Sequence, residues 1–444
     1  MLRGDRLPFA ITLAIYTLLF LFTFHEADED VWGRIAAGRL TVSEGQVPER
    51  DVFAYVPTKP RWVDHEWLSG VIFYEVHRSF GGRGLLVLRA VVGAAAMAFL
   101  FKAARAANPW TVALLSIAVW PLIAQGFNSV VRAQAFTFLF FAASLFVLER
   151  GKARLALVPL TALWSNLHGG FVLGPLLLVA YGSYGLGAAA FAASVLNPYG
   201  IHYWRYLGSA LWMPRPEIVE WRPAELLGIG DLHVQGALLL ALVLLWEPER
   251  PKRSHLIALA GAGLASLLHV RFAPLLGMVI IVTLALSWER LFEKRRHLPA
   301  LGAMTAALGL VFIGLTVAWS QRDFSLQMRV PEDRYPVAAV ERLKAERGNL
   351  AVYFNWGEYA LYHLYPGLHV SIDGRYETVY PDEVVRANWD FTRGVPGSEK
   401  FLQTYSADFA LYPWETGAAR WLEGSSSWDL LYKDGFSVLY RRRE

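Results

Sequence analysis

Cysteine is absent from the 444-residue sequence, which excludes disulfides, thiolate metal ligands and cysteine nucleophiles. Charge is scarce as well, because 18% of the residues are charged, whereas soluble globular proteins average about 25%. The formal net charge is only +4, and no run of lysine or arginine alternates with aromatic residues, so nothing indicates nucleic-acid binding. The sequence also lacks a serine-hydrolase elbow, a P-loop, a dinucleotide fingerprint and an HExxH motif.

Apolar residues dominate the chain instead. They make up 55% of it, and the mean hydropathy is +0.32. They lie in blocks separated by short basic loops, which predicts a polytopic α-helical membrane protein. We expect eleven spans, near residues 8–24, 85–104, 110–126, 135–148, 155–164, 171–181, 186–196, 234–246, 256–268, 272–286 and 298–319. Three glycines, at 182, 185 and 187, leave open that the pair 171–196 is one helix, which would invert every later span.

Basic residues indicate the orientation. No small-x-small cleavage site follows the first span, so we interpret it as an uncleaved helix. With eleven spans, most loop lysines and arginines fall on the N-terminal side, as the positive-inside rule requires. We therefore expect a multi-pass protein of the inner (plasma) membrane, with a cytoplasmic N-terminus and an extracytoplasmic C-terminus. Arg89 lies within a span, and we expect its side chain to reach the outer interface.

The first outer loop, residues 25–82, is rich in acidic side chains. Asp28 and Asp30 follow the first span directly. Two carboxylates at this position can hold a divalent cation such as Mg²⁺ or Mn²⁺, contact a sugar hydroxyl, or supply a general base. The structural alternative is a helix N-cap, which Asp30 alone would provide for a helix over 31–40.

A second acidic cluster, Asp64-His65-Glu66, stands at the start of an amphipathic helix that we place on the membrane surface. His65 and Glu66 can contact a substrate or act together in proton transfer. Alternatively, Asp64 caps the helix that begins at Trp67. The two interpretations are compatible with each other.

Later polar loops are predicted on the same outer face as the first loop. They include SNLHGG with Asn166 and His168, LNPYGIHYW, EIVEWRP, and HVRF with Arg271. Arg132 and Arg271 are candidates for clamping a phosphate with their forked donors. A capping asparagine and a tight glycine turn are the alternative for Asn166 and His168. One shared site on this face is the simplest interpretation.

The composition changes after residue 320. Alternating strand and helix patterns, closed by a hairpin with an Asp434-Gly435 turn, predict a small soluble α/β domain over 321–444, following a membrane domain over 1–320. Asp373 and Arg375 leave one of the strands, where α/β sheets present ligand groups. They can equally form a local ion pair that fixes a turn.

Taken together, these motifs resemble a known pattern. Asp28-x-Asp30-x-Trp32, WVDHEWL, WSNLHGGFVLG, LNPYG and SIDGRYETVYPDEV, on a first span, an acidic loop, many spans and an outer domain, are similar to bacterial multi-pass proteins with the architecture of the GT-C superfamily of membrane glycosyltransferases. The resemblance implies a GT-C-like membrane domain with a C-terminal extracytoplasmic α/β domain. It also implies transfer of a sugar from a polyprenyl-phosphate donor to a lipid, glycan or protein acceptor.

The resemblance places the catalytic acid in the first outer loop, at Asp30 or Asp28, with a slight preference for Asp30. The base would activate an acceptor hydroxyl for an inverting attack on the anomeric carbon. The substrate and its phosphate would be bound by His65, Glu66, Arg132, Asn166, His168, Arg271, Asp373 and Arg375. Two alternatives stay open: a ligase or polymerase with a pyrophosphate-linked donor, and a non-enzymatic membrane assembly or binding protein.

Overall fold

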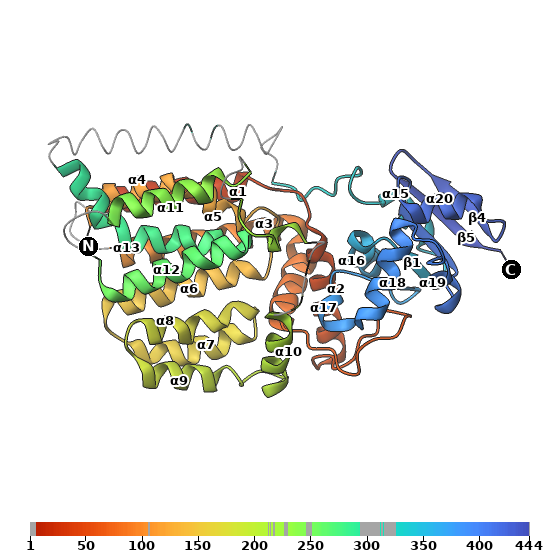
Figure 1. The fold of residues 1–444 in the computed structure, drawn as a ribbon, viewed down its shortest axis with the longest axis horizontal. Helices are drawn as coiled ribbons and strands as arrows, with labels where there is room; N and C mark the ends of the chain where they lie inside the picture. The colour runs from red at the N-terminus through yellow and green to blue at the C-terminus, as the bar shows by residue number, and fades with distance from the viewer. Residues whose placement is uncertain are drawn as a thin grey trace. The chain divides into compact units, whose positions relative to one another are not determined.

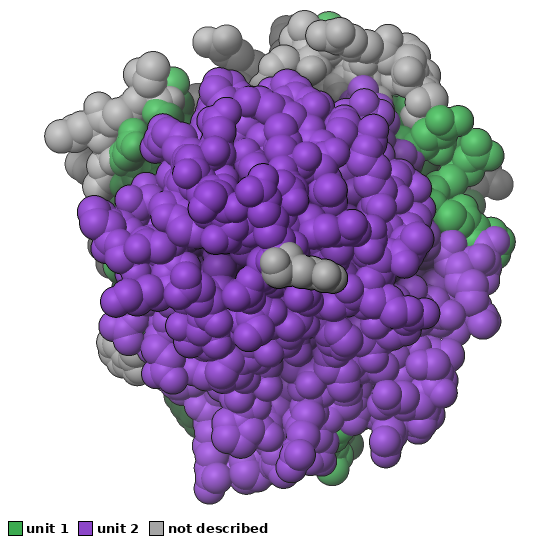
Figure 2. Space-filling view, turned by 90° about the vertical axis from the view of Figure 1, so that its right-hand side faces the viewer, with its two compact units in different colours: residues 1–25, 80–200, 211–327 green, residues 26–79, 201–210, 328–444 purple. Residues whose placement is uncertain are grey.

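The chain folds as two compact units, coloured separately in Figure 2. The structure is a computed structural model that describes residues 6–104, 107–211, 213, 215, 218–225, 230–245, 251–293, 311, 314 and 326–443. Unit 1 comprises residues 1–25, 80–200 and 211–327, and unit 2 comprises 26–79, 201–210 and 328–444. The first loop, which the sequence analysis grouped with the membrane domain, therefore folds with the C-terminal residues.

Unit 1 is a bundle of apolar helices, several of which run roughly parallel or antiparallel in Figure 1. The helix α13 contacts α4, α5, α6, α11 and α12 and is largely buried, so it forms the centre of the bundle. A helix that is apolar on all sides needs such cover or a membrane. The helices of this unit are α1 (Arg6–Phe22), α4 (Pro109–Ala118), α5 (Trp120–Gln125), α6 (Gln134–Arg150), α7 (Leu157–Ser165), α8 (Leu173–Ala180), α9 (Tyr184–Ala193), α11 (Leu232–Leu245), α12 (Arg253–Leu268) and α13 (Ala273–Glu293).

Helices occupy each predicted span that falls on described residues, and the last span, 298–319, lies almost wholly outside them. Within the described residues, Trp67–Ala103 and Val270–Trp288 are long and apolar enough to cross a membrane, and shorter apolar helices of 10–17 residues accompany them. The eleven-span count and the orientation stay predictions. Between 171 and 196 the structure has two helices, α8 and α9, separated at Gly182, whose φ of 72° suits glycine.

The helix α3 (Trp67–Ala103) belongs to both units. It is interrupted at Gly81, where φ is 62° and ψ is −161°. The segment before this kink is the predicted surface helix, and the segment after it contains the predicted second span. The boundary between the units falls beside the kink, at residues 79 and 80.

Arg89, in the second segment of α3, is buried among the helices of unit 1. Only 1% of it is exposed, and it donates hydrogen bonds to the carbonyl oxygens of Phe20, Thr23 and Phe24 at the end of α1, and to that of Ser129. The last turn of α1 needs donors for its carbonyls, and the guanidinium supplies them. The predicted position of Arg89 at the membrane interface stays a prediction.

Unit 2 contains a five-stranded sheet in the order β2-β1-β3-β5-β4, which confirms the predicted small sheet domain. The strands β1 (Gly348–Val352), β2 (Leu368–Val370) and β3 (Phe409–Pro413) are parallel, and β5 (Ser437–Arg442) runs antiparallel to both β3 and β4 (Trp428–Lys433). Asp434 accepts hydrogen bonds from the backbone of Phe436 and Ser437, which closes the β4–β5 hairpin.

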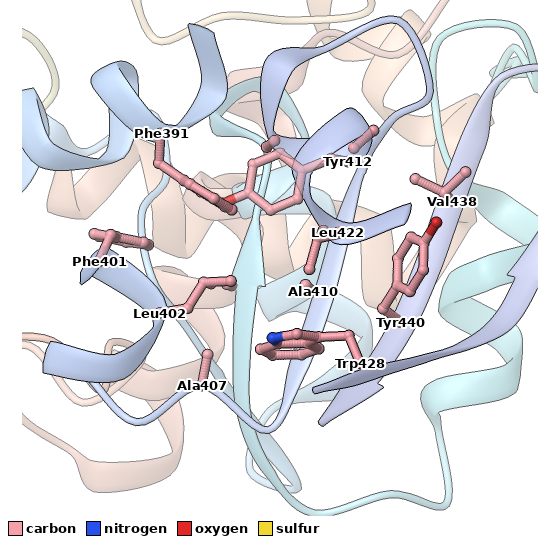
Figure 3. Packing of buried hydrophobic residues seen from close by; sticks show 13 residues of the cluster. Phe391, Phe401, Leu402, Ala407, Ala410, Tyr412, Leu422, Trp428, Val438 and Tyr440 are labelled. Atoms are coloured by element: carbon pink, nitrogen blue, oxygen red, sulfur yellow. The ribbon is translucent and has the colours of Figure 1, made fainter. Parts of the chain in front are cut away.

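One face of the sheet is covered by α18 (Asp382–Arg393), α19 (Lys400–Thr404) and α20 (Gly417–Gly424). Figure 3 shows Phe391 of α18 beside Tyr412 of β3, and Leu422 of α20 between Tyr412 and Tyr440 of β5; the ring of Phe401 of α19 packs against that of Phe391. Alternate residues of β3 (Ala410, Tyr412) and of β5 (Val438, Tyr440) belong to this core, as the two-residue period of a strand requires. The helix α15 (Val337–Leu343) contacts β5, and α16 (Gly357–Leu364) contacts β2.

The first loop pairs with the sheet through its backbone. The Val370 N–H donates to the carbonyl of Phe53 at 2.9 Å, and the Tyr55 N–H donates to the carbonyl of Val370 at 3.2 Å. The edge of β2 is thereby covered, and residues from both ends of the sequence share one folded unit.

Candidate functional site

The acidic loop of unit 2 leads into α2 (Glu29–Glu44), which begins two residues before the predicted helix. Asp28 is its N-cap, and the Oδ1 atom of Asp28 accepts a hydrogen bond from the Asp30 N–H at 3.0 Å. The capping role that the sequence analysis gave to Asp30 therefore belongs to Asp28. Asp30 lies in the first turn, where the helix dipole stabilises a carboxylate.

A second carboxyl group, that of Glu358, lies beside Asp30. Glu358 is in the first turn of α16 and is only 2% exposed. Its Oε2 atom accepts a hydrogen bond from the Gly33 N–H at 2.9 Å. Burial raises the pKa of Glu358 well above its ordinary value, and the charge of Asp30 adds to this rise. Burial and the charge of Asp30 therefore favour the neutral form of the Glu358 carboxyl.

Two glycines permit this arrangement. A Cβ atom on Gly33 would lie 2.2 Å from the Oε2 atom of Glu358, which no side chain can occupy. A Cβ atom on Gly374 would lie 2.7 Å from the Oε1 atom of Glu358 and 3.4 Å from the Oδ1 atom of Asp30. Both carboxyl groups therefore lie close to Gly374, where a larger residue would collide with Glu358.

Arg34, one turn into α2, balances these acids. Its Nη1 atom lies 2.7 Å from the Oδ1 atom of Asp64 and 3.5 Å from the Oε2 atom of Glu66. Burial alone lowers the pKa of Arg34, but the charges of Asp64 and Glu66 outweigh burial and raise the pKa above its usual value. The side chain of Asp64 therefore binds Arg34, and its backbone carbonyl accepts the Trp67 N–H at 3.1 Å.

His65 and Glu66 are brought together with α10 (Ile201–Leu211). The Nε2 atom of His65 lies 3.5 Å from the Oε1 atom of Glu66, and the His65 ring lies 5.1 Å from that of Tyr206, between centroids. The Tyr206 hydroxyl donates to the Oε2 atom of Glu377 at 3.3 Å. An imidazole, a phenol and two carboxylates on neighbouring elements form a surface of the kind that binds sugar hydroxyls and ring faces.

Asp373 and Arg375 form the local ion pair that the sequence analysis left open. The Nε and Nη2 atoms of Arg375 bind the two oxygens of Asp373 at 2.9 and 2.7 Å, and its Nη1 atom binds Asp51 at 2.6 Å. The Arg375 side chain is fully buried, and its guanidinium packs against the rings of Phe53 and Trp62. This pair fastens the first loop to the sheet, so its geometry is that of a structural connection.

In unit 1 the two candidate phosphate-binding arginines meet at one carboxylate. The Nη1 atom of Arg132 lies 3.0 Å from the Oε2 atom of Glu220, and the Nη1 atom of Arg271 lies 3.9 Å from its Oε1 atom. The guanidinium of Arg271 also lies 4.3 Å from the ring centre of Trp221. Both arginines are therefore partly exposed, and both bind the same negatively charged group, the carboxylate of Glu220.

Asn166 and His168, also in unit 1, stabilise a turn. The Asn166 side chain donates to the carbonyls of Ala162 and Leu196 at 2.8 and 2.9 Å. The Nδ1 atom of His168 accepts the Gly170 N–H at 2.9 Å and lies 2.8 Å from the Thr137 hydroxyl. The capping and turn alternative accounts for these contacts, and a substrate role for the two residues stays a prediction.

Glu358 and Glu220 were not predicted as site residues. Each lies next to an aromatic residue, Glu358 in the first turn of α16 (NWGEY) and Glu220 in the loop EIVEWRP, and this was the only signal. No group of three or more histidine, aspartate or glutamate residues that could hold a metal ion occurs in the part of the chain that the structure describes. Whether the acids of unit 2 and the arginines of unit 1 serve one site stays a prediction.

Comparison with known proteins identifies the fold. No protein-family model and no curated protein matches the sequence. The structure is similar to the archaeal oligosaccharyltransferase AglB from Archaeoglobus fulgidus, solved in complex with an inhibitory peptide and a dolichol-phosphate. The TM-score is 0.64 at 12% identity, over 95% of this chain and 72% of AglB. It is also similar to the arabinofuranosyltransferase AftD from Mycobacteria, with a TM-score of 0.53 at 12% identity, over 98% of this chain and 40% of AftD. Both are membrane glycosyltransferases of the GT-C superfamily, so this chain has the GT-C fold.

Proposed function

We propose that this protein is a membrane glycosyltransferase that moves a sugar from a polyprenyl-phosphate donor to an acceptor on the non-cytoplasmic face of the membrane. The observation that carries the proposal is the Asp30 carboxylate in the first turn of α2, next to the neutral carboxyl of Glu358, in a chain with the GT-C fold. The dolichol-phosphate in the AglB complex supports a lipid phosphate donor.

Asp30 is the base of the proposed reaction. It removes the proton from an acceptor hydroxyl, whose oxygen attacks the anomeric carbon from the face opposite the phosphate. The bond between that carbon and the phosphate oxygen breaks, its electron pair leaves with the polyprenyl phosphate, and the configuration inverts. Asp28 is the weaker candidate because its Oδ1 atom serves the N-cap. A positioned base contributes roughly 10²- to 10⁴-fold to the rate.

Arg132 and Arg271 bind the phosphate in this proposal. Planar guanidinium groups match phosphate oxygens in pairs and stabilise the charge that develops on the leaving group. His65 and Glu66, with Tyr206, contact the sugar or the acceptor. A divalent cation, if the reaction uses one, would bind Asp28 and Asp30 and would add positive charge near the leaving phosphate.

The full-length protein in lipid nanodiscs, given a panel of radiolabelled polyprenyl-phosphate sugars and a membrane extract as acceptor, tests the proposal. We expect one donor to be consumed with release of polyprenyl phosphate, and the anomeric configuration of the product to be inverted. Consumption of pyrophosphate-linked donors alone would favour the ligase or polymerase. If the Asp28→Asn, Asp30→Asn double variant restored cellular function to a deletion strain, an assembly role would replace the enzymatic one.

A further inference from the structure

Glu220 pairs with the two arginines to which the proposed function assigns the donor phosphate. Each oxygen of its carboxylate faces one guanidinium, Oε2 facing Arg132 and Oε1 facing Arg271. The side chain of Glu220 is 34% exposed, that of Arg132 22% and that of Arg271 18%, so a ligand can reach all three. Each guanidinium carries five N–H donors, so it can bind a phosphate oxygen together with Glu220.

Neighbouring groups hold this arrangement in place. The guanidiniums of Arg271 and Arg215 lie 4.3 and 4.1 Å from the ring centre of Trp221, the residue that follows Glu220. The carbonyl oxygen of Trp221 lies 2.6 Å from the Nδ1 atom of His269. Burial raises the pKa of Glu220, but the charges of Arg132 and Arg271 outweigh burial and keep the pKa below its ordinary value. The carboxylate is therefore ionised at neutral pH.

The charge of this group is the decisive feature. Two guanidiniums and one carboxylate leave a single positive charge among Arg132, Arg271 and Glu220. A sugar linked to a lipid through one phosphate is a phosphodiester and carries one negative charge, whereas the corresponding pyrophosphate carries two. We propose that Glu220 sets the charge of the donor, so that the site accepts a lipid-linked sugar monophosphate and discriminates against a lipid-linked sugar pyrophosphate. This inference rests on the proposed function and specifies its donor class.

The test compares two soluble probes that differ by one phosphate group and its negative charge, geranyl methyl phosphate and geranyl methyl pyrophosphate. Their binding to the full-length protein in detergent is measured by calorimetry at low salt. The wild-type protein should bind the monophosphate more tightly. Glu220→Gln removes one negative charge and should shift the ratio of the two dissociation constants toward the pyrophosphate by about tenfold or more. Glu220→Asp keeps the charge and should leave the ratio unchanged.

Two further variants keep the result interpretable. Glu225→Gln is the matched control, because Glu225 is an exposed carboxylate of the same loop that lies 3.8 Å from Arg222. It should change neither dissociation constant. Arg271→Gln removes a positive charge and should shift the ratio in the opposite direction, which provides a second test if Glu220→Gln fails to fold.

The possible outcomes separate the inference from the proposed function. A ratio that is the same in wild type, Glu220→Gln and Arg271→Gln would overturn the inference, as would failure of the wild type to bind either probe. In both cases, sugar transfer from polyprenyl-phosphate donors by the wild type would leave the proposed function intact. Absence of both probe binding and sugar transfer would overturn both.

Discussion

Removing the charge of Asp30, and separately that of Asp28, distinguishes a catalytic from a structural carboxylate. Asparagine is as good an N-cap as aspartate, so Asp28→Asn preserves the bond to the Asp30 N–H and removes only the charge. We expect this variant to keep the stability of the wild type and an activity within a few fold of it. Asp30→Asn leaves the cap intact but removes the proposed base, so the rate should fall by about 10²- to 10⁴-fold.

A third variant measures the cap itself. Asp28→Ala removes the side-chain acceptor and should cost about 1 kcal/mol of stability, a typical value for an N-cap. Thermal unfolding in detergent reports stability, and release of polyprenyl phosphate from a labelled donor reports activity. Donor binding should be the same in all three variants, because the phosphate is assigned to Arg132 and Arg271. The reasoning is refuted if Asp30→Asn stays active, or if Asp28→Asn loses activity as completely as Asp30→Asn while remaining folded.

Three further perturbations test the interior of unit 2. Arg375→Met leaves the carboxylates that it binds buried and unpaired, and should cost about 3–5 kcal/mol, seen as a lower unfolding temperature. Gly33→Ala places a methyl group 2.2 Å from the Oε2 atom of Glu358 and should lower the stability by about 1–3 kcal/mol in the same measurement. Gly45→Ala is the control, because its methyl group meets no atom within 4 Å and the variant reports only the backbone strain at a φ of 68°. The pKa of Glu358 is raised in the folded state, so its contribution to stability is complete below its unfolded pKa of about 4.3 and is lost as the pH rises through the folded pKa. Glu358→Gln should therefore gain stability relative to the wild type between pH 5 and pH 8, and an unchanged difference would contradict the assignment of a neutral carboxyl.

Local patterns in the sequence predicted local structure well. The apolar blocks located the helices of unit 1, and Asp434-Gly435 located the hairpin between β4 and β5. An aspartate N-cap was predicted for α2, but it was assigned to Asp30 in place of Asp28, since both residues are suitable N-caps. Which of them caps α2 depends on where the chain leaves α1, and composition does not encode that.

Contacts between residues far apart in the chain could not be predicted from the sequence. The partners of Arg89, backbone carbonyls at the end of α1, could not be predicted because they leave no trace in the residue pattern. Glu358 looked like an ordinary first-turn acid of α16 until the fold placed it against Gly33, 325 positions earlier in the chain. A buried acid is costly unless its surroundings hold it neutral or pair it, so its significance appears only with its neighbours.

The same reasoning explains why the first loop belongs to unit 2. A change of composition near residue 320 marks where apolar spans give way to a soluble domain, but it does not say which earlier segments complete that domain. The edge of β2 needs backbone partners, which Phe53 and Tyr55 supply, and the buried Arg375 needs a second carboxylate, which Asp51 supplies. Both requirements are met by one short stretch of the first loop. The sheet domain is therefore complete only with that loop, and the loop that carries Asp30 takes its shape from residues at the other end of the chain.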